Sequence, residues 1–185
     1  MAKSNNIEFI KSIYEPKDFF NKTLAEIVFC GRSNVGKSSL INALLKTNIA
    51  RVSATPGRTQ AINYFLIDKS YYLVDIPGYG YAKMPKTLKS KLARLLEYYF
   101  SNNSMIKLIL LLLDFRHSPS VDDIQMLDWL KQMQKDFIIC FTKCDKISKT
   151  KRQKQLSDYF KNVINDNNDN YIITSAIENI GLKEL

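Results

Sequence analysis

The sequence predicts an α/β fold in which a mostly parallel sheet carries helices on both faces. Short apolar runs alternate with longer amphipathic runs along the 185 residues, and this alternation is typical of strands followed by helices. Most of the short runs are too apolar to have a solvated face, which places them in a sheet covered on both sides. The first run is followed by a glycine-containing turn and then a longer run, as expected for a strand, a loop and a helix.

Six strands are expected, in the order in which the apolar runs occur. They span Glu26–Cys30, Ile62–Ile67, Tyr71–Asp75, Ile106–Asp114, Phe137–Thr142 and Tyr171–Thr174. Only three residues separate the second run from the third, so these two strands pair as an antiparallel hairpin at the edge of the sheet. One of the helices between the other runs is marked by an apolar stripe at helical spacing, made of Leu88, Leu92, Leu95 and Tyr99.

Length and composition indicate one domain over residues 1–185, with residues 1–24 as an N-terminal extension packed on it. The chain is 45% hydrophobic but has no apolar run long enough to span a membrane and no secretion signal, so a cytoplasmic protein is expected. The cysteines Cys30, Cys140 and Cys144 are an odd number without C-x-x-C spacing. Neither a disulfide framework nor a structural zinc site is therefore expected.

The positive charge of the chain is concentrated in two stretches. The chain has 27 Lys and Arg against 18 Asp and Glu, a net charge of +9. Residues 83–94 hold five cations and no acid, and residues 143–154 hold six cations and one acid, so these stretches together carry +10. This clustering suggests a polyanionic partner such as a nucleic acid, although a lysine-rich helix can also be only a solvated face.

A phosphate-binding loop is predicted directly after the first strand. Residues 31–38 fit the motif G-x-x-x-x-G-K-[ST]. The glycines of such a loop let consecutive backbone N–H groups face phosphate oxygens, and the N-terminus of the following helix adds a favourable dipole. Lys37 supplies a positive charge and the Ser38 hydroxyl is a magnesium ligand.

Two further motifs narrow the nucleotide to a guanine nucleotide. Asp75–Gly78 is a D-x-x-G sequence, in which the aspartate holds Mg²⁺ through water and the glycine N–H touches the γ-phosphate. Residues 142–145 follow a later strand, and the carboxylate of Asp145 can accept hydrogen bonds from the ring N–H and the exocyclic amine of guanine. Adenine offers neither donor there, so its binding would leave a buried carboxylate unpaired.

The remaining contacts to the base are expected from two other positions. Lys143 would lay its aliphatic stem along the base, and Ser175-Ala176 could offer backbone N–H groups to the guanine carbonyl oxygen. All four motifs lie at the carboxyl ends of predicted strands, where open α/β sheets bind their ligands.

The chain closely resembles the EngB family of bacterial and organellar GTPases. The resemblance lies in GRSNVGKSSLINAL at 31–44, TPGRTQ at 55–60, DIPGYGYA at 75–82, LLLDFRHSP at 111–119 and TKCDK at 142–146. It implies a three-layer, Ras-like P-loop fold with a six-stranded mixed sheet, and GTP hydrolysis with GDP as product. It also implies a bacterial cytoplasmic protein, expected to be a monomer, that acts on the large ribosomal subunit precursor and its rRNA and is needed for normal cell division.

The resemblance also extends the nucleotide site to a first switch. TPGRTQ would place the Thr59 hydroxyl on Mg²⁺; Thr55 is the rival threonine, but it precedes Pro56. The catalytic residues are then Lys37, Thr59 and Gly78. The full nucleotide site comprises Gly31, Arg32, Ser33, Asn34, Val35, Gly36, Lys37, Ser38, Ser39, Gly57, Arg58, Thr59, Gln60, Ala61, Asp75, Ile76, Pro77, Gly78, Thr142, Lys143, Cys144, Asp145, Thr174, Ser175 and Ala176.

Two residues affect the expected mechanism. Many small GTPases place a glutamine directly after D-x-x-G to orient the attacking water, but this chain has Tyr79, so slow intrinsic hydrolysis is expected. Related GTPases with asparagine at the position of Asn34 use its side-chain oxygen to hold K⁺ near the phosphates. We therefore expect K⁺, the ribosome or both to stimulate hydrolysis, unless Asn34 only stabilises the loop.

Two other functions are alternatives to a GTPase switch. One is a nucleotide-gated module that binds rRNA or the ribosome and in which hydrolysis is incidental. The other is a P-loop kinase, which is disfavoured because nothing resembles a catalytic base for an acceptor hydroxyl. The chain departs from the family after Gly181, where four residues remain and the final helix is expected to be truncated.

Overall fold

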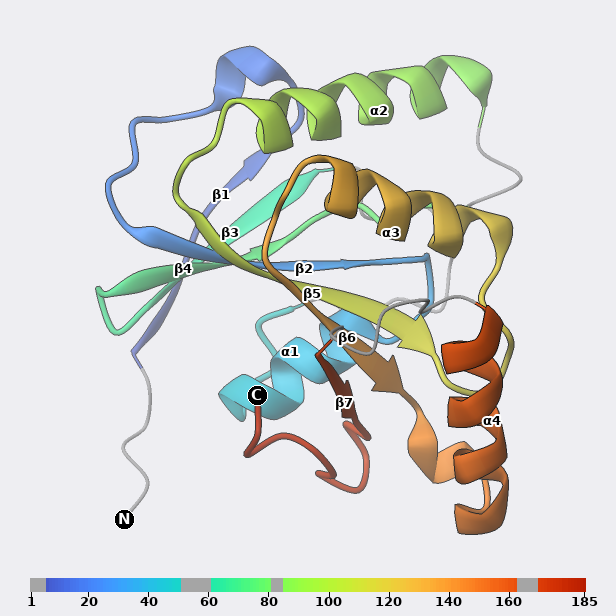
Figure 1. Ribbon diagram of the computed structural model, residues 1–185. Helices are drawn as coiled ribbons and strands as arrows, with labels where there is room; N and C mark the ends of the chain where they lie inside the picture. The colour runs from blue at the N-terminus through green and yellow to red at the C-terminus, as the bar shows by residue number, and fades with distance from the viewer. Residues whose placement is uncertain (1–5, 51–60, 81–84, 163–169) are drawn as a thin grey trace.

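A seven-stranded mixed sheet forms the centre of the protein (Figure 1). The computed structural model describes residues 6–50, 61–80, 85–162 and 170–185. The strands are β1 (Ile7–Ile13), β2 (Ala25–Gly31), β3 (Ile62–Ile67), β4 (Tyr71–Asp75), β5 (Ile106–Asp114), β6 (Phe137–Thr142) and β7 (Tyr171–Ile173). They lie in the order β1-β3-β4-β2-β5-β6-β7, and β2 occupies the middle of the sheet.

The strand pairing confirms the predicted hairpin. β3 pairs antiparallel with β4, with Asn63 opposite Asp75 and Ile67 opposite Tyr71. The pairs of β2 with β4, β2 with β5, β5 with β6 and β6 with β7 are all parallel. The carboxyl ends of these four central parallel strands and of β7 therefore lie along one edge, which is where the predicted motifs begin.

The sequence predicts six strands, whereas the residues that the structure describes form seven. β1 pairs antiparallel with β3 and forms the edge of the sheet, within the segment expected to be an N-terminal extension. Its register shifts between Phe9 and Lys11, and Phe9 is exposed. A bulged edge strand shows neither a continuous apolar run nor regular alternation, so its pattern in the sequence is too weak to identify.

Helices cover both faces of the sheet, as predicted. In Figure 1, α2 (Lys86–Ser101) and α3 (Val121–Gln132) lie above the sheet and α1 (Lys37–Leu45) lies below it. α4 (Lys149–Asn162) contributes Tyr159 to the same buried cluster as α2 and α3. Two single 3₁₀ turns, η1 (Pro16–Asp18) and η2 (Cys144–Lys146), complete the described elements.

The side chains of β5 show why the central strands are apolar throughout. Ile109 and Leu111 belong to the cluster with α2 and α3, whereas Leu110 and Leu112 belong to the cluster with α1. Successive residues of a strand point to opposite faces, so a sheet covered on both faces needs apolar residues at every position. No helix in the described ranges is long and apolar enough to span a membrane.

A buried ion pair joins the segment before β2 to the core. Lys22 Nζ lies 2.6 Å from Glu26 Oε1, and the exposed fractions of the two side chains are 9% and 0%. The other carboxylate oxygen of Glu26 accepts hydrogen bonds from the Tyr99 hydroxyl at 2.6 Å and from Asn103 Nδ2 at 2.8 Å. Lys22 Nζ also lies 4.6 Å from the ring centre of Tyr64. These hydrogen bonds and the aromatic ring offset the free-energy cost of removing the two charges from water.

Candidate functional site

The predicted phosphate-binding loop connects β2 to α1, as its motif requires. Gly36 precedes the first residue of α1 and has a φ of 112°, a backbone conformation that favours glycine. Lys37 is the first residue of α1, is 8% exposed, and donates a hydrogen bond from Nζ to the Gly31 carbonyl at 3.3 Å. Ser38 and Ser39 follow in the first turn of α1. The loop therefore presents helix N–H groups, a lysine ammonium and a serine hydroxyl at one edge of the sheet.

Asp75, at the end of β4, has the environment expected of a residue near a metal ion. It is 4% exposed, and its Oδ1 atom has no hydrogen-bond partner among the residues that the structure describes. Burial raises the pKa of the Asp75 carboxyl to about 6, although the Lys37 charge acts in the opposite direction. A buried carboxylate oxygen without a partner fits a water molecule bound to Mg²⁺, so the residues present suit this ion.

The D-x-x-G segment packs directly on the phosphate-binding loop. A Cβ atom on Gly78 would lie only 2.7 Å from the Ser33 amide nitrogen, so this approach requires glycine. The Ser33 N–H donates to the Tyr79 carbonyl at 3.0 Å. Ile76 and Pro77 connect Asp75 to this contact and are buried. A displacement of Gly78 would therefore be transmitted to the loop.

The segment after β6 also binds to the phosphate-binding loop. Thr142 Oγ1 donates to the Val35 carbonyl at 2.7 Å, and Lys143 Nζ donates to the Asn34 carbonyl at 2.6 Å. Asn34 has a φ of 63°, which asparagine tolerates better than most residues. This backbone conformation supports the alternative in which Asn34 stabilises the loop. The base-reading and phosphate-binding segments form one connected unit.

Asp145 and Ser175, which are both predicted to read the guanine base, lie next to each other in the structure. Ser175 Oγ donates to Asp145 Oδ1 at 2.8 Å, and the Asp145 side chain is 6% exposed. Burial alone would raise the pKa of the Asp145 carboxyl, but the hydrogen bonds from Ser175 and Lys146 outweigh it and hold the pKa below its ordinary value. The carboxylate thus stays ionised and can accept hydrogen bonds from a base.

A backbone hydrogen bond joins η2 to the residue that follows β7. Cys144 is buried, and its N–H donates to the Thr174 carbonyl at 3.2 Å. Ala176 is partly exposed beside Ser175. The structure therefore brings the predicted residues Thr142 to Asp145 and Thr174 to Ala176 to one place.

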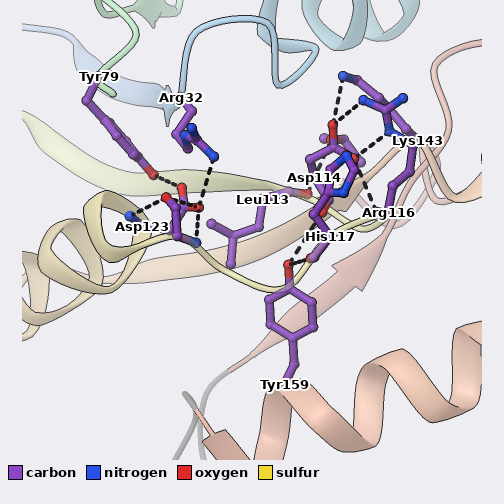
Figure 2. Close-up of polar contacts among 11 residues, drawn as sticks. Arg32, Tyr79, Leu113, Asp114, Arg116, His117, Asp123, Lys143 and Tyr159 are labelled. Atoms are coloured by element: carbon purple, nitrogen blue, oxygen red, sulfur yellow. Dashed lines mark hydrogen bonds and ion pairs between the residues drawn. The ribbon is translucent and has the colours of Figure 1, made fainter. Parts of the chain in front are cut away.

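A second acid that the sequence analysis did not assign to the site, Asp114, lies beside Lys143. Asp114 Oδ2 is 2.9 Å from Lys143 Nζ and 2.7 Å from Arg116 Nη2 (Figure 2). Burial would raise the pKa of the Asp114 carboxyl, but the hydrogen bonds from Arg116 and Lys143 lower it to about 2. The signals in the sequence are that this acid ends an apolar run and that it lies within residues 111–119, one of the segments that resemble the EngB family. Phe115 and Arg116 form a turn directly after β5.

Tyr79, the residue directly after the D-x-x-G segment, is hydrogen-bonded to α3. Its hydroxyl donates to Asp123 Oδ1 at 2.9 Å, and Arg32 Nη1 approaches Asp123 Oδ2 at 4.0 Å (Figure 2). Asp123 also forms a capping box with Ser120 at the start of α3. Burial raises the pKa of the Tyr79 hydroxyl, with smaller contributions from the charges nearby, so it stays protonated. Tyr79 therefore packs as a structural link and is not available to orient a water molecule.

Part of the predicted first switch lies outside the described residues. This part comprises Gly57, Arg58, Thr59 and Gln60, together with the rival Thr55. Ala61 is described and is buried beside the start of β3. The chemistry that the described residues can perform is binding of phosphates at α1, of Mg²⁺ through Asp75 and of a guanine base at Asp145.

Comparisons with known proteins agree with this geometry. Residues 26–143 match the family model described as 50S ribosome-binding GTPase. A probable GTP-binding protein EngB from Fusobacterium nucleatum subsp. nucleatum is 45% identical, and the match covers 99% of this chain and 94% of the relative. A protein with the same description from Oceanobacillus iheyensis is 43% identical over 94% of this chain and 90% of the relative.

Solved structures show the same fold. The crystal structure of a probable GTP-binding protein engB superposes with a TM-score of 0.67 at 24% identity, covering 86% of this chain and 94% of that chain. The crystal structure of a variant of Aquifex aeolicus Era bound to GDP.AlF4- superposes with a TM-score of 0.69 at 20% identity, covering 88% of this chain and 55% of that chain.

Proposed function

The chain belongs to the EngB family of GTP-binding proteins, within the ribosome-binding GTPases, and on this basis we propose that it is a slow GTPase that switches in large ribosomal subunit assembly. It would act in the bacterial cytoplasm as a monomer and be needed for normal cell division. The observation that carries the proposal is the contact of Gly78 with Ser33, because it joins the γ-phosphate-sensing segment to the phosphate-binding loop. Directly after that segment, the chain carries an excess of positive charge.

The residues of the site would divide the chemistry among them. Lys37 would bind the phosphates, and Gly78 would sense the γ-phosphate through its N–H group. Mg²⁺, held by Ser38 and Thr59 and by Asp75 through water, would neutralise charge that develops on the phosphate oxygens. Asp145 would select guanine, since adenine would leave this buried carboxylate unpaired.

Slow intrinsic hydrolysis is expected because Tyr79 donates its hydroxyl to Asp123 at 2.9 Å. We expect K⁺ bound by the Asn34 side-chain oxygen, the large subunit, or both to supply the missing stimulation. The test compares single-turnover GTP hydrolysis in Na⁺ and K⁺, each with and without large subunits, and repeats it with Asn34→Ala. Equal rates under all four conditions contradict the stimulation, and equal effects of K⁺ on both proteins contradict the role of Asn34.

Exposed cations on two helices offer a surface for rRNA. The described ones are Lys86, Lys89, Lys91 and Arg94 on α2 and Lys149, Lys151 and Lys154 on α4. Cations that contact phosphates release counterions, so the affinity for RNA falls as the salt concentration rises. α2 begins a few residues after Gly80, so nucleotide state could control its presentation.

Neutralising the four cations of α2 to glutamine should weaken binding to large subunits and flatten its salt dependence while leaving GTP affinity nearly intact. Neutralising the three cations of α4 is the matched comparison. If association is unchanged by the α2 substitutions, these residues are only a solvated face.

The alternative function is a nucleotide-gated module in which hydrolysis is incidental. Tyr79 favours it, because the described residues place no glutamine after D-x-x-G. Single-turnover hydrolysis on isolated large-subunit precursors separates the two functions. Acceleration by the precursor supports the GTPase switch, and a slow rate unchanged by the precursor supports the module.

A further inference from the structure

We propose that Asp114 is a positioning residue of the nucleotide site. Its carboxylate holds Lys143 against the phosphate-binding loop and keeps Arg116 away from the guanine-reading Asp145. The inference rests on the proposed guanine-nucleotide site and adds a residue that acts through its neighbours.

The position of Asp114 follows from the sheet. It is the last residue of β5 and lies opposite Thr142, the last residue of β6. Because adjacent parallel strands end together, the first residue after β6, Lys143, is brought next to the Asp114 side chain. Asp114 Oδ2 lies 2.9 Å from Lys143 Nζ.

Lys143 is held at two points. Its ammonium group donates to Asp114 Oδ2 and, at 2.6 Å, to the Asn34 carbonyl. Its stem passes Gly36, since an ideal Cβ on Gly36 would lie 3.8 Å from Lys143 Cε. A lysine side chain held at its far end loses its rotamer freedom before a ligand arrives, so less entropy is lost on binding.

Arg116 is held by the same carboxylate. Its Nε atom donates to Asp114 Oδ1 at 2.9 Å and its Nη2 atom to Oδ2 at 2.7 Å, a bidentate pair (Figure 2). The Arg116 side chain is 39% exposed and interacts electrostatically with Asp145. Lys143 and Arg116 therefore share the Asp114 carboxylate, and Arg116 also interacts with the Asp145 carboxylate.

The consequence for Asp145 is a competition. This carboxylate already accepts a hydrogen bond from Ser175 at 2.8 Å and pairs with Lys146 at 3.4 Å, and its other lone pairs would serve the base. Without the Asp114 charge, Arg116 would pair with Asp145 and occupy those lone pairs. Asp114 therefore protects the base-reading group as well as positioning Lys143.

A purely structural role for Asp114 makes a different prediction. Asp114 Oδ1 also accepts from the Arg116 backbone N–H at 3.2 Å, and its carbonyl accepts from the His117 N–H at 3.2 Å. If these turn contacts were its whole contribution, replacement of Asp114 would lower only the stability of the protein. Any weaker nucleotide binding would then not be reversed by removal of the Arg116 side chain.

The test uses the full chain and fluorescent GDP and GTP analogues. Asp114→Asn keeps the shape and one acceptor for the turn but removes the charge. We expect the dissociation constants for both nucleotides to rise by about tenfold and by similar factors, because Lys143 would lose one of its two fixed contacts and Arg116 would compete with the base for Asp145. The rate of single-turnover hydrolysis at saturating GTP should stay within about twofold, since Asp114 is not expected to contact the phosphates.

Three further variants make the test specific. Asp114→Glu keeps the carboxylate and should bind GDP within about threefold of the wild type. Asp114→Asn combined with Arg116→Gln should bind more tightly than Asp114→Asn alone, because competition of Arg116 for Asp145 is removed, but not as tightly as the wild type, because Lys143 still lacks its partner carboxylate. Asp136→Asn, the same change at an exposed residue at the opposite end of β6, should have no effect. Thermal unfolding without nucleotide should show that all variants are folded.

Two results overturn the inference. One is that Asp114→Asn binds the nucleotides with wild-type affinity, and the other is that Asp114→Asn and its combination with Arg116→Gln bind them equally weakly. If Asp114→Asn fails to fold, the comparison of Asp114→Glu with the wild type decides, and a loss of about tenfold there overturns it. If the wild type itself binds neither GDP nor GTP, the proposed function fails instead.

Discussion

Replacement of Gly78 by alanine tests the contact between the two phosphate-binding segments. An added Cβ would lie 2.7 Å from the Ser33 amide nitrogen and 2.9 Å from the Ser33 Cα, whereas ordinary contacts begin at 3.4 Å. Relief requires a backbone shift of about 0.7 Å, since rotation of a side chain cannot remove a clash with backbone atoms. The strain is about 1–3 kcal/mol, and the same shift weakens the hydrogen bond from Ser33 to the Tyr79 carbonyl by about 1 kcal/mol.

The expected result is a loss that is selective for GTP. If Gly78 senses the γ-phosphate, its displacement should weaken GTP binding by about tenfold or more while GDP binding changes by less than about threefold. Fluorescent nucleotide binding measures both affinities, and single-turnover hydrolysis should slow in parallel. Unchanged GTP affinity and hydrolysis in a folded Gly78→Ala protein would rule out this role of Gly78, as would an equal loss for GDP.

Three other predictions concern the core, the loop junction and the effect of pH. Thr142→Val removes the hydroxyl that donates to Val35 at 2.7 Å without leaving a cavity, so urea unfolding should show a loss of about 1–3 kcal/mol and GDP binding should weaken. Lys22→Met leaves the buried Glu26 without its ion-pair partner, so urea unfolding at pH 7 should show a loss of about 3–5 kcal/mol, and Lys17→Met at an exposed site should show almost none. The pKa of Asp114 is lowered to about 2 in the folded state, so its stabilisation is complete well above the ordinary value of 3.8 and is lost as pH falls toward 2. The difference in unfolding free energy between the wild type and Asp114→Asn should therefore shrink between about pH 5 and pH 3, and a constant difference would contradict the shift.

Most of the fold could be predicted because the central strands are covered on both faces. Ile106–Asp114 appears in the sequence as a continuous apolar run, and β5 has the same bounds. The edge strand β1 could not be predicted, because a bulge between Phe9 and Lys11 interrupts its alternation. The other edge strand, β7, could be predicted, because it appears in the sequence as a short apolar run without such an interruption.

The parts of the candidate site that could be predicted are those whose residues lie close together in the sequence. The proposed contacts of residues 31–38 with phosphates and of residues 142–145 with the base each lie within one loop, so their spacing in the sequence is enough to predict them. Asp114 and Asp123 act on side chains that are distant in sequence, Lys143 and Tyr79 respectively. Such partnerships depend on how strands end next to one another, which no local pattern records.

Association with the large ribosomal subunit in different nucleotide states is the most direct test of the proposed switch. Co-sedimentation of the wild-type protein with large subunits should be measured with a non-hydrolysable GTP analogue, with GDP and without nucleotide, at fixed salt concentration. We expect association at least about tenfold tighter with the GTP analogue than with GDP, because in the proposed site the N–H group of Gly78 would contact the γ-phosphate, which GDP lacks. Equal association in the three states would contradict the switch.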